Sequence, residues 1–88
     1  MATVWIPSPL QALTGGEAAV RADGGNVREL VEDLDRAFPG FKAAIVGEGV
    51  LVRPGISIVV DGSIVKKGLL HPVGADSEVF FIPAIGGG

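Results

Sequence analysis

Only one stretch of the 88-residue chain has the periodicity of an amphipathic helix, and this limits the possible folds more than any other feature. Asn26 precedes the stretch and Glu29 follows three positions later, so their side chains are predicted to cap free amides reciprocally. Pro39-Gly40 is predicted to end the helix. Charged residues take one face, and apolar residues recur at i, i+3, i+4 and i+7 on the other: Val27, Leu30, Val31, Leu34 and Phe38.

Two segments near the N-terminus have strand character. Residues 3–6 are β-branched and aromatic and predict a first strand. Residues 18–22 predict a second strand with Val20 facing inward, and the turn between them falls at residues 14–17. Together they predict a hairpin with an elongated loop.

The C-terminal half contains three more candidate strands. Residues 56–60 form an apolar run of strand length, and Asp61-Gly62 favours a type I′ turn that leads into a returning strand at 63–65. Residues 78–82 predict a last strand. Pro83 has no amide hydrogen to donate, so pairing is expected to end there.

The order of these elements predicts an α+β grasp, a mixed sheet of four to five strands with one main helix packed on one face. Residues 41–55 have no single periodicity, although Phe41, Ile45 and Val46 favour a short helix or turn. A helix that follows the first hairpin buries its apolar stripe by crossing one sheet face, and this brings the last strand beside the first as a parallel neighbour. The other sheet face is expected to stay open.

Length and composition predict one cytoplasmic domain at residues 1–82, followed by a flexible glycine-rich tail at 83–88. The absence of cysteine excludes disulfides and cysteine-based metal sites. A net charge of −3 with scattered bases makes nucleic acid an unfavourable partner. The chain contains neither a signal peptide nor an apolar run of about 18 residues, so we expect no membrane association.

Signals for catalysis are weak. His71 is the only histidine and is followed by Pro72, which favours a turn over a general base or metal ligand. Glu32 and Asp33 lie on the solvated face of the helix. The glycine-rich "TGGE" and "DGGN" lack the spacing of phosphate-binding loops. We therefore expect no catalytic residue, no metal site and no bound cofactor.

The C-terminal "EVFFIPAIGGG" carries the strongest functional signal. Gly86, Gly87 and Gly88 lack Cβ atoms, so they form a thread thin enough for a narrow active site on another protein, with a free carboxylate at its tip. A carboxylate becomes a good electrophile once the partner uses ATP to convert it to an acyl adenylate, after which a thiolate or persulfide can displace AMP. A frayed or engineered terminus is the alternative.

Ordering such a tail requires a docking surface elsewhere, because fixing each residue costs about 1–2 kcal/mol of backbone entropy. Alternation along the strands sends Trp5, Phe80 and Ile82 to the open sheet face, where the pairing of the first and last strands brings them together. Ile85 adds an apolar lead-in to the tail. A loop covering this face is the alternative. The opposite face is expected to hold Val4, Ile6, Val79 and Phe81.

Three stretches, "VWIPSPL" with "TGGE", "ISIVVDG" and "VFFIPAIGGG", resemble the ThiS/MoaD family of ubiquitin-like sulfur carriers, and most of all its CysO-like branch. The resemblance covers essentially the whole chain. It implies a β-grasp fold and adenylation of the terminal glycine by an E1-like adenylyltransferase/sulfurtransferase, followed by conversion to a thiocarboxylate. By position, Gly88 would be modified, Gly87 completes the glycine pair, Gly86 takes a free position, and Ile82 presents an apolar side chain to the E1-like partner.

The sulfur acceptor stays open. The resemblance implies a biosynthetic partner that makes cysteine or another sulfur-containing metabolite: a cysteine synthase-like enzyme, a thiazole synthase-like enzyme or a molybdopterin synthase large subunit. The chain could also be a molybdopterin synthase small subunit, a protein modifier joined through Gly88 to lysines, or a plain β-grasp interaction module. Ala75 and Asp76 depart from the family's usual Asp-Gly-Asp turn, and this is expected to alter a loop rather than the chemistry.

Overall fold

A computed structural model describes residues 1–46, 55–65 and 68–83 of the chain. Its described strands form one mixed sheet in the order β2-β1-β5-β3-β4, so the last strand in the sequence lies at the centre. β1 and β5 run parallel, and the other neighbouring strands pair antiparallel. The expected grasp arrangement, with the first and last strands as parallel neighbours, is confirmed. The strands are β1 (Ala2–Trp5), β2 (Ala19–Ala22), β3 (Ile56–Val60), β4 (Ser63–Ile64) and β5 (Glu78–Pro83).

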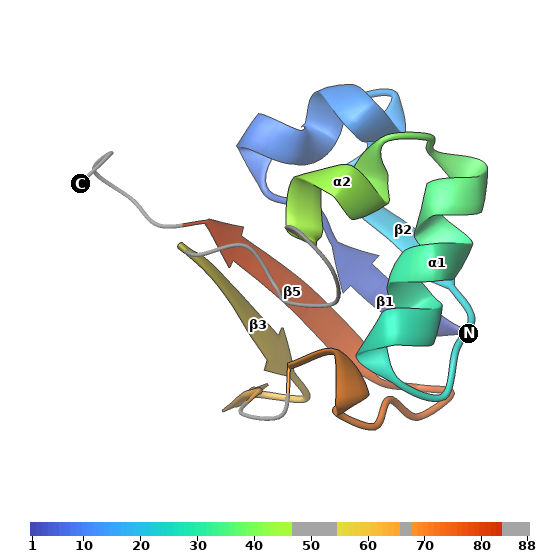
Figure 1. Cartoon of the computed structure of the whole chain (residues 1–88), viewed down its shortest axis with the longest axis vertical. Helices are drawn as coiled ribbons and strands as arrows, with labels where there is room; N and C mark the ends of the chain where they lie inside the picture. The colour runs from blue at the N-terminus through green and yellow to red at the C-terminus, as the bar shows by residue number, and fades with distance from the viewer. Residues whose placement is uncertain (47–54, 66–67, 84–88) are drawn as a thin grey trace.

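Two α-helices lie together on one side of this sheet (Figure 1). The main helix is α1 (Val27–Ala37), and α2 (Phe41–Ile45) follows it after a short connection. Two 3₁₀-helices, η1 (Ser8–Thr14) and η2 (Gly68–Leu70), complete the described helical segments. None of the helices in the described part of the chain is both long enough and apolar enough to cross a membrane.

The first turn of α1 is capped by two side chains. The Glu29 amide donates to Asn26 Oδ1 at 2.8 Å, as the sequence predicts. Glu29 Oε1 accepts the amide hydrogen of Gly25 at 2.8 Å, one residue before the one expected for a capping box. Asn26 has an extended backbone, with φ −149° and ψ 173°, and the chain therefore reaches the helix with the Gly25 amide beside the Glu29 carboxylate.

The elongated loop expected between β1 and β2 contains a helical segment that the sequence did not predict, η1. Pro9 lies in the first turn, where a fixed φ favours helix and the missing amide costs nothing. Gly15 then ends η1 with a φ of 65°. The loop is also tied down by side chains: Gln11 Nε2 donates to the Ile6 carbonyl at 3.0 Å, and the buried Thr14 hydroxyl donates to the Glu17 carbonyl at 2.8 Å.

The core fills the space between the sheet and the helices. The predicted inward residues of β1 and β5 are buried, and so is the apolar stripe of α1 from Val27 to Leu34. Val20 and Phe38 pack against this core from its margin. Phe41 of α2 meets Phe81 of β5 edge to face, with ring centroids 5.7 Å apart. The expected short helix after Pro39-Gly40 is therefore part of the core.

The β3–β4 hairpin has the predicted turn. Asp61 and Gly62 have φ values of 50° and 85°, which are the positive values that a type I′ turn requires. β5 extends one residue beyond the predicted strand, to Pro83, which pairs in register with Ile56. The remainder of the tail assigned to 83–88, from residue 84 on, lies outside the described residues, as does the later part of 41–55 from residue 47 to 54.

Candidate functional site

The sheet face opposite the helices carries a row of apolar side chains that crosses all five strands. We call this face the open face, and the row the apolar row. Residues directly opposite one another in neighbouring strands point to the same side of a sheet. The registers therefore place one residue from each strand side by side: Ala19, Trp5, Phe80, Val59 and Ile64.

The three predicted docking residues that the structure describes come together on the open face. Trp5 and Phe80 are adjacent within the apolar row, and Ile82 follows on β5, two residues nearer the C-terminus. Trp5 is 39% exposed and Ile82 is 44% exposed, whereas Phe80 is half-buried. The predicted division of β1 and β5 into a core face and an open face is confirmed.

Trp5 and Phe80 form a stacked aromatic pair. Their ring centroids are 5.8 Å apart, and the ring planes differ by 9°. The indole nitrogen of Trp5 donates a hydrogen bond of 3.1 Å to Glu78 Oε1. Glu78 belongs to the next row on the same face, with Thr3 and Arg21, so the apolar row has a polar border.

Sequence reasoning missed Val59, Ile64 and Glu78 as parts of this surface. Ile64 is 68% exposed and extends the apolar row to the edge strand. The sequence contains a signal that places Ile64 on this surface. A two-residue type I′ turn at Asp61-Gly62 fixes the hairpin register and makes Ile64 the partner of Val59. Glu78 lies two residues before Phe80 and so shares its face.

Asp61 ties the hairpin turn to the start of β5. Its Oδ1 accepts the Glu78 amide hydrogen at 2.9 Å, and its Oδ2 accepts the Ser77 hydroxyl at 2.7 Å. The Asp61 amide in turn donates to the Glu78 carbonyl at 2.9 Å. The bond from the Glu78 amide and then that from the Ser77 hydroxyl lower the pKa of Asp61, with a smaller contribution from the charge of His71.

The predicted reactive tail continues from this surface. Gly88, Gly87, Gly86 and Ile85 lie outside the described residues. β5, which carries Phe80 and Ile82, is the strand that leads to them and ends at Pro83. Two of the docking candidates, Phe80 and Ile82, therefore share one strand with the start of the tail, and Trp5 lies on the neighbouring strand β1.

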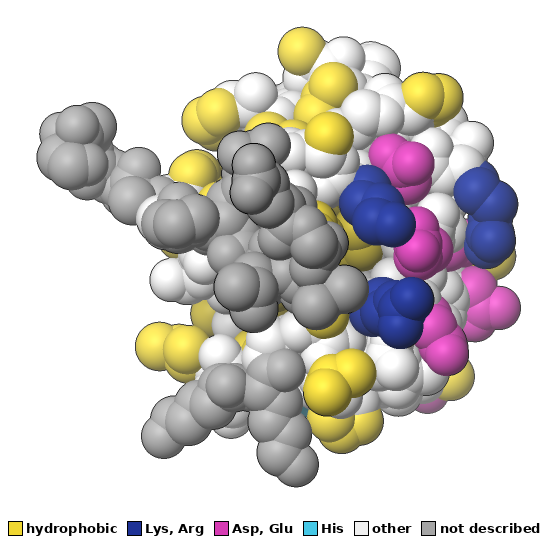
Figure 2. Space-filling model, in the orientation of Figure 1, with side chains coloured by type: hydrophobic (Ala, Val, Ile, Leu, Met, Phe, Trp, Pro, Cys, Tyr) yellow, Lys and Arg dark blue, Asp and Glu magenta, His cyan; other side chains and the backbone are white. Residues whose placement is uncertain are grey.

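Charged side chains gather over α1 on the helix side of the molecule (Figure 2). Figure 2 shows Lys and Arg side chains next to Asp and Glu side chains over this side. A hollow of about 490 Å³ is lined by charged side chains of α1 and by Asp23, Asn26 and Leu70. Arg36 and then the Asp23 amide lower the pKa of Asp33 by hydrogen bonding. A carboxyl group that stays ionised is a poor general acid, so these contacts favour a structural role.

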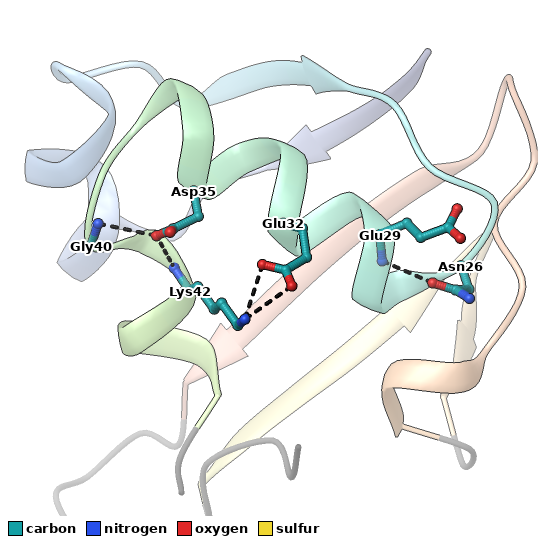
Figure 3. Close-up of polar contacts among 6 residues, drawn as sticks. All are labelled: Asn26, Glu29, Glu32, Asp35, Gly40 and Lys42. Carbon is teal, nitrogen blue, oxygen red and sulfur yellow. Dashed lines mark hydrogen bonds and ion pairs between the residues drawn. The ribbon is translucent and has the colours of Figure 1, made fainter. Parts of the chain in front are cut away.

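Other carboxylates on this side are engaged within the fold (Figure 3). Glu32 pairs with the Lys42 ammonium at 3.0 Å, and Asp35 Oδ1 accepts the amide hydrogens of Gly40 and Lys42 at 3.1 and 3.0 Å. Within the residues that the structure describes, no three or more His, Asp or Glu side chains gather in a way that could hold a metal ion. His71 directly follows η2, where its carbonyl accepts the Val27 amide hydrogen at 3.0 Å.

A five-stranded mixed sheet with a central parallel pair, wrapped around one main helix, defines a ubiquitin-like β-grasp protein. The ThiS family model matches residues 4–88, and the chain belongs to the ThiS family. A comparison with curated proteins finds no match.

Solved structures agree with this assignment. A chain of the BexX/CysO complex from Amycolatopsis orientalis is 33% identical, with full coverage of both chains and a TM-score of 0.93. CysO from Mycobacterium tuberculosis is 24% identical, with 97% of this chain and 100% of that chain covered and a TM-score of 0.91. Small archaeal modifier protein 1 from Methanosarcina acetivorans shares the fold at 20% identity, with 99% and 95% coverage and a TM-score of 0.84. Within the family, the 33% identical chain of the BexX/CysO complex supports the CysO-like branch.

Proposed function

We propose that the protein is a sulfur carrier whose terminal Gly88 is adenylated by an E1-like enzyme and converted to a thiocarboxylate, which then donates sulfur to a biosynthetic enzyme. The observation that carries the proposal is the apolar row across the open face, whose central residue Phe80 lies on the strand that leads to the C-terminal glycines. Membership of the ThiS family supports it. The relative from Amycolatopsis orientalis forms a complex with BexX, which supports binding to a partner protein.

The carrier supplies only the reacting carboxylate in this chemistry. The Gly88 carboxylate attacks the α-phosphate of ATP on the partner and releases pyrophosphate, and a sulfur nucleophile then displaces AMP from the acyl adenylate. The carrier is a substrate in both steps and contributes no catalytic residue and no bound cofactor. Its contribution is binding energy, because docking through the open face offsets the entropy lost when the glycines enter the active site.

Intact mass spectrometry tests this proposal. The full chain is incubated with a cognate E1-like enzyme, ATP and a sulfide source, and the expected product has gained the mass difference between sulfur and oxygen. A chain without Gly88 is expected to keep its circular dichroism spectrum and to gain no mass, since a terminal glycine buries little area. An unchanged wild-type mass with an enzyme that thiolates its own carrier would contradict the proposal.

The same incubation separates transfer of sulfur from conjugation. A cysteine synthase-like enzyme, a thiazole synthase-like enzyme or a molybdopterin synthase large subunit is then added together with its own sulfur-accepting substrate. With one of these enzymes the carrier is expected to return to its original mass, because the substrate takes the sulfur and water supplies the oxygen of the restored carboxylate. Conjugation to lysines through Gly88 instead produces larger species that survive reducing agent. Such species in place of the thiocarboxylate would identify a protein modifier.

A further inference from the structure

We propose that Glu78 is a positioning residue for docking, which holds the Trp5 indole against Phe80 and so keeps the apolar row in one conformation for the activating enzyme. The inference rests on the proposed function, because it concerns the surface through which the carrier would bind that enzyme. It assigns Glu78 a role beyond that of a polar border.

The pairing of β1 with β5 puts Glu78 within reach of Trp5. Thr3 is the partner of Glu78, and Trp5 is the partner of Phe80, so Glu78 is the diagonal neighbour of Trp5 on the same face. Such neighbours lie about 7–8 Å apart, a span that long side chains can bridge. The bond from Trp5 Nε1 to Glu78 Oε1, 3.1 Å long, spans this diagonal.

Glu78 is itself held in place by the β3–β4 turn. Its amide donates to Asp61 Oδ1 and its carbonyl accepts the Asp61 amide hydrogen, both at 2.9 Å. Ser77, the preceding residue, donates its hydroxyl to Asp61 Oδ2 at 2.7 Å. A continuous series of bonded groups therefore runs from Asp61 through Glu78 to Trp5, and the stacked ring of Phe80 is its end.

This arrangement affects docking in two ways. Trp5 is 39% exposed, and an indole that is fixed before binding has less rotamer freedom to lose when a partner covers it. In addition, the indole N–H already has its acceptor within the carrier, so a partner needs only an apolar surface opposite Trp5 and no hydrogen-bond acceptor. Removing the acceptor oxygen of the Glu78 side chain loses both advantages.

The composition of the chain provides a direct readout. Trp5 is the only tryptophan, and the chain has no tyrosine, so indole fluorescence and the single indole N–H resonance both report on Trp5 alone. The variants are Glu78→Ala, which removes the acceptor, and Glu78→Gln, which keeps an acceptor oxygen but removes the charge. The control variant is Asp76→Asn. It also removes one negative charge, two residues before Glu78, but it leaves the bond from the indole to Glu78 in place.

Glu78→Ala is expected to lower the fluorescence anisotropy of Trp5, shift its indole N–H resonance, and raise the KM of the activating enzyme about three- to tenfold with kcat unchanged. Glu78→Gln is expected to restore the indole resonance and bring KM within about twofold of wild type, because an amide oxygen also accepts the bond. Asp76→Asn is expected to match wild type in both measurements.

A wild-type indole signal in Glu78→Ala would overturn the positioning role. An altered signal with an unchanged KM would overturn its importance for docking. If a competent enzyme does not accept the wild-type chain at all, the proposed function fails, and so does the inferred effect of Glu78 on docking. The indole signal still decides whether Glu78 holds Trp5.

Discussion

At the scale of single residues, Asp61 connects the β3–β4 turn to the start of β5. The Asp-Gly dipeptide predicts the type I′ turn because both residues tolerate the positive φ values that the structure shows. The bonds from the Asp61 carboxylate to Ser77 and Glu78 span 16 and 17 residues, and they form only after β5 has paired beside β3. Local chemistry alone could not reveal these partners.

The pKa of Asp61 leads to a pH-dependent prediction. Its value in the folded chain lies below the value of about 3.9 for an unperturbed aspartate, so the ionised carboxylate stabilises the fold. This contribution is complete above the unfolded-state pKa and is lost as the pH falls through the lower folded-state pKa. Asp61→Asn keeps the turn but weakens the bonds, so wild type should unfold at a higher urea concentration than the variant at pH 7.

The difference between the two chains should shrink as urea titrations are repeated below about pH 4, because Asp61 is protonated first in the unfolded chain and, at a lower pH, in the folded chain. The charge of His71 also lowers the pKa of Asp61. A gap in urea midpoints that stays constant from pH 7 to acid would contradict the role of the Asp61 charge.

Two adjacent glycines before α1 are predicted to respond differently to alanine. Gly24 has a φ of 157°, and a Cβ there would lie 2.6 Å from the backbone nitrogen of Leu30, inside the first turn of α1. Gly25 has no such backbone contact, and its nearest neighbour is the flexible Glu29 carboxylate at 3.4 Å. Gly24→Ala should therefore cost about 1–3 kcal/mol of unfolding free energy and Gly25→Ala less, measured by thermal or urea denaturation. Equal losses would show that the turn adjusts to a Cβ.

At the scale of elements, α2 depends on its neighbours. A five-residue helix is too short to be stable alone. Gly40 is the N-cap residue of α2 and has no side chain to cap the helix. Asp35 of α1 instead supplies the acceptor for the amides of Gly40 and Lys42. Phe41 then buries its ring against Phe81 of the sheet. The end of α1 thus determines where α2 begins.

Two carboxylates of α1 that contact the α2 segment should differ in importance. Asp35→Ala removes the acceptor for two amides and should cost about 1 kcal/mol, as loss of a helix cap does. Glu32→Ala removes an ion pair whose side chains are 41–43% exposed, and should cost at most about 0.5 kcal/mol. Hydrogen exchange at the Lys42 amide should accelerate in the first variant and not in the second. The opposite order would show that the ion pair holds α2.

Elements with a strong local pattern were predictable from the sequence, and η1 was not. The caps and the apolar stripe predict α1. Alternation and the turn dipeptides predict the strands. η1 begins at a proline-rich segment without a side-chain cap, and its contacts run back to Ile6 and forward to Glu17. These contacts belong to the folded hairpin, so the segment alone indicated only a loop.

At the scale of the whole molecule, β5 has one face in the core and one face open. Its alternate residues, Val79 and Phe81, are buried under the helices, whereas Phe80 and Ile82 lie on the open face. The sequence predicted this division because alternation is a local property of a strand. It did not predict the full width of the apolar row, since that depends on how Ile64 and Val59 are placed by the order of the strands.

Two neighbouring phenylalanines of β5 should therefore give opposite results. Phe81→Ala should cost about 3–5 kcal/mol of unfolding free energy, because it empties a buried site against Phe41. Phe80→Ala removes the stacking partner of Trp5 and should cost about 1 kcal/mol. Its main effect should be a weaker interaction with the activating enzyme, measured by titration of the folded carrier. Normal binding by Phe80→Ala would exclude the apolar row as the docking surface.

The central place of β5 also has a consequence for biosynthesis. A ribosome makes β1 first and β5 last, yet β1 and β3 meet only through β5. The sheet therefore cannot close until translation has passed Pro83 and that residue has left the exit tunnel. A nascent chain interrupted earlier lacks the strand that joins the two hairpins and also lacks Phe80, the central residue of the apolar row. An enzyme that recognises this face would in this way handle finished chains and ignore incomplete ones.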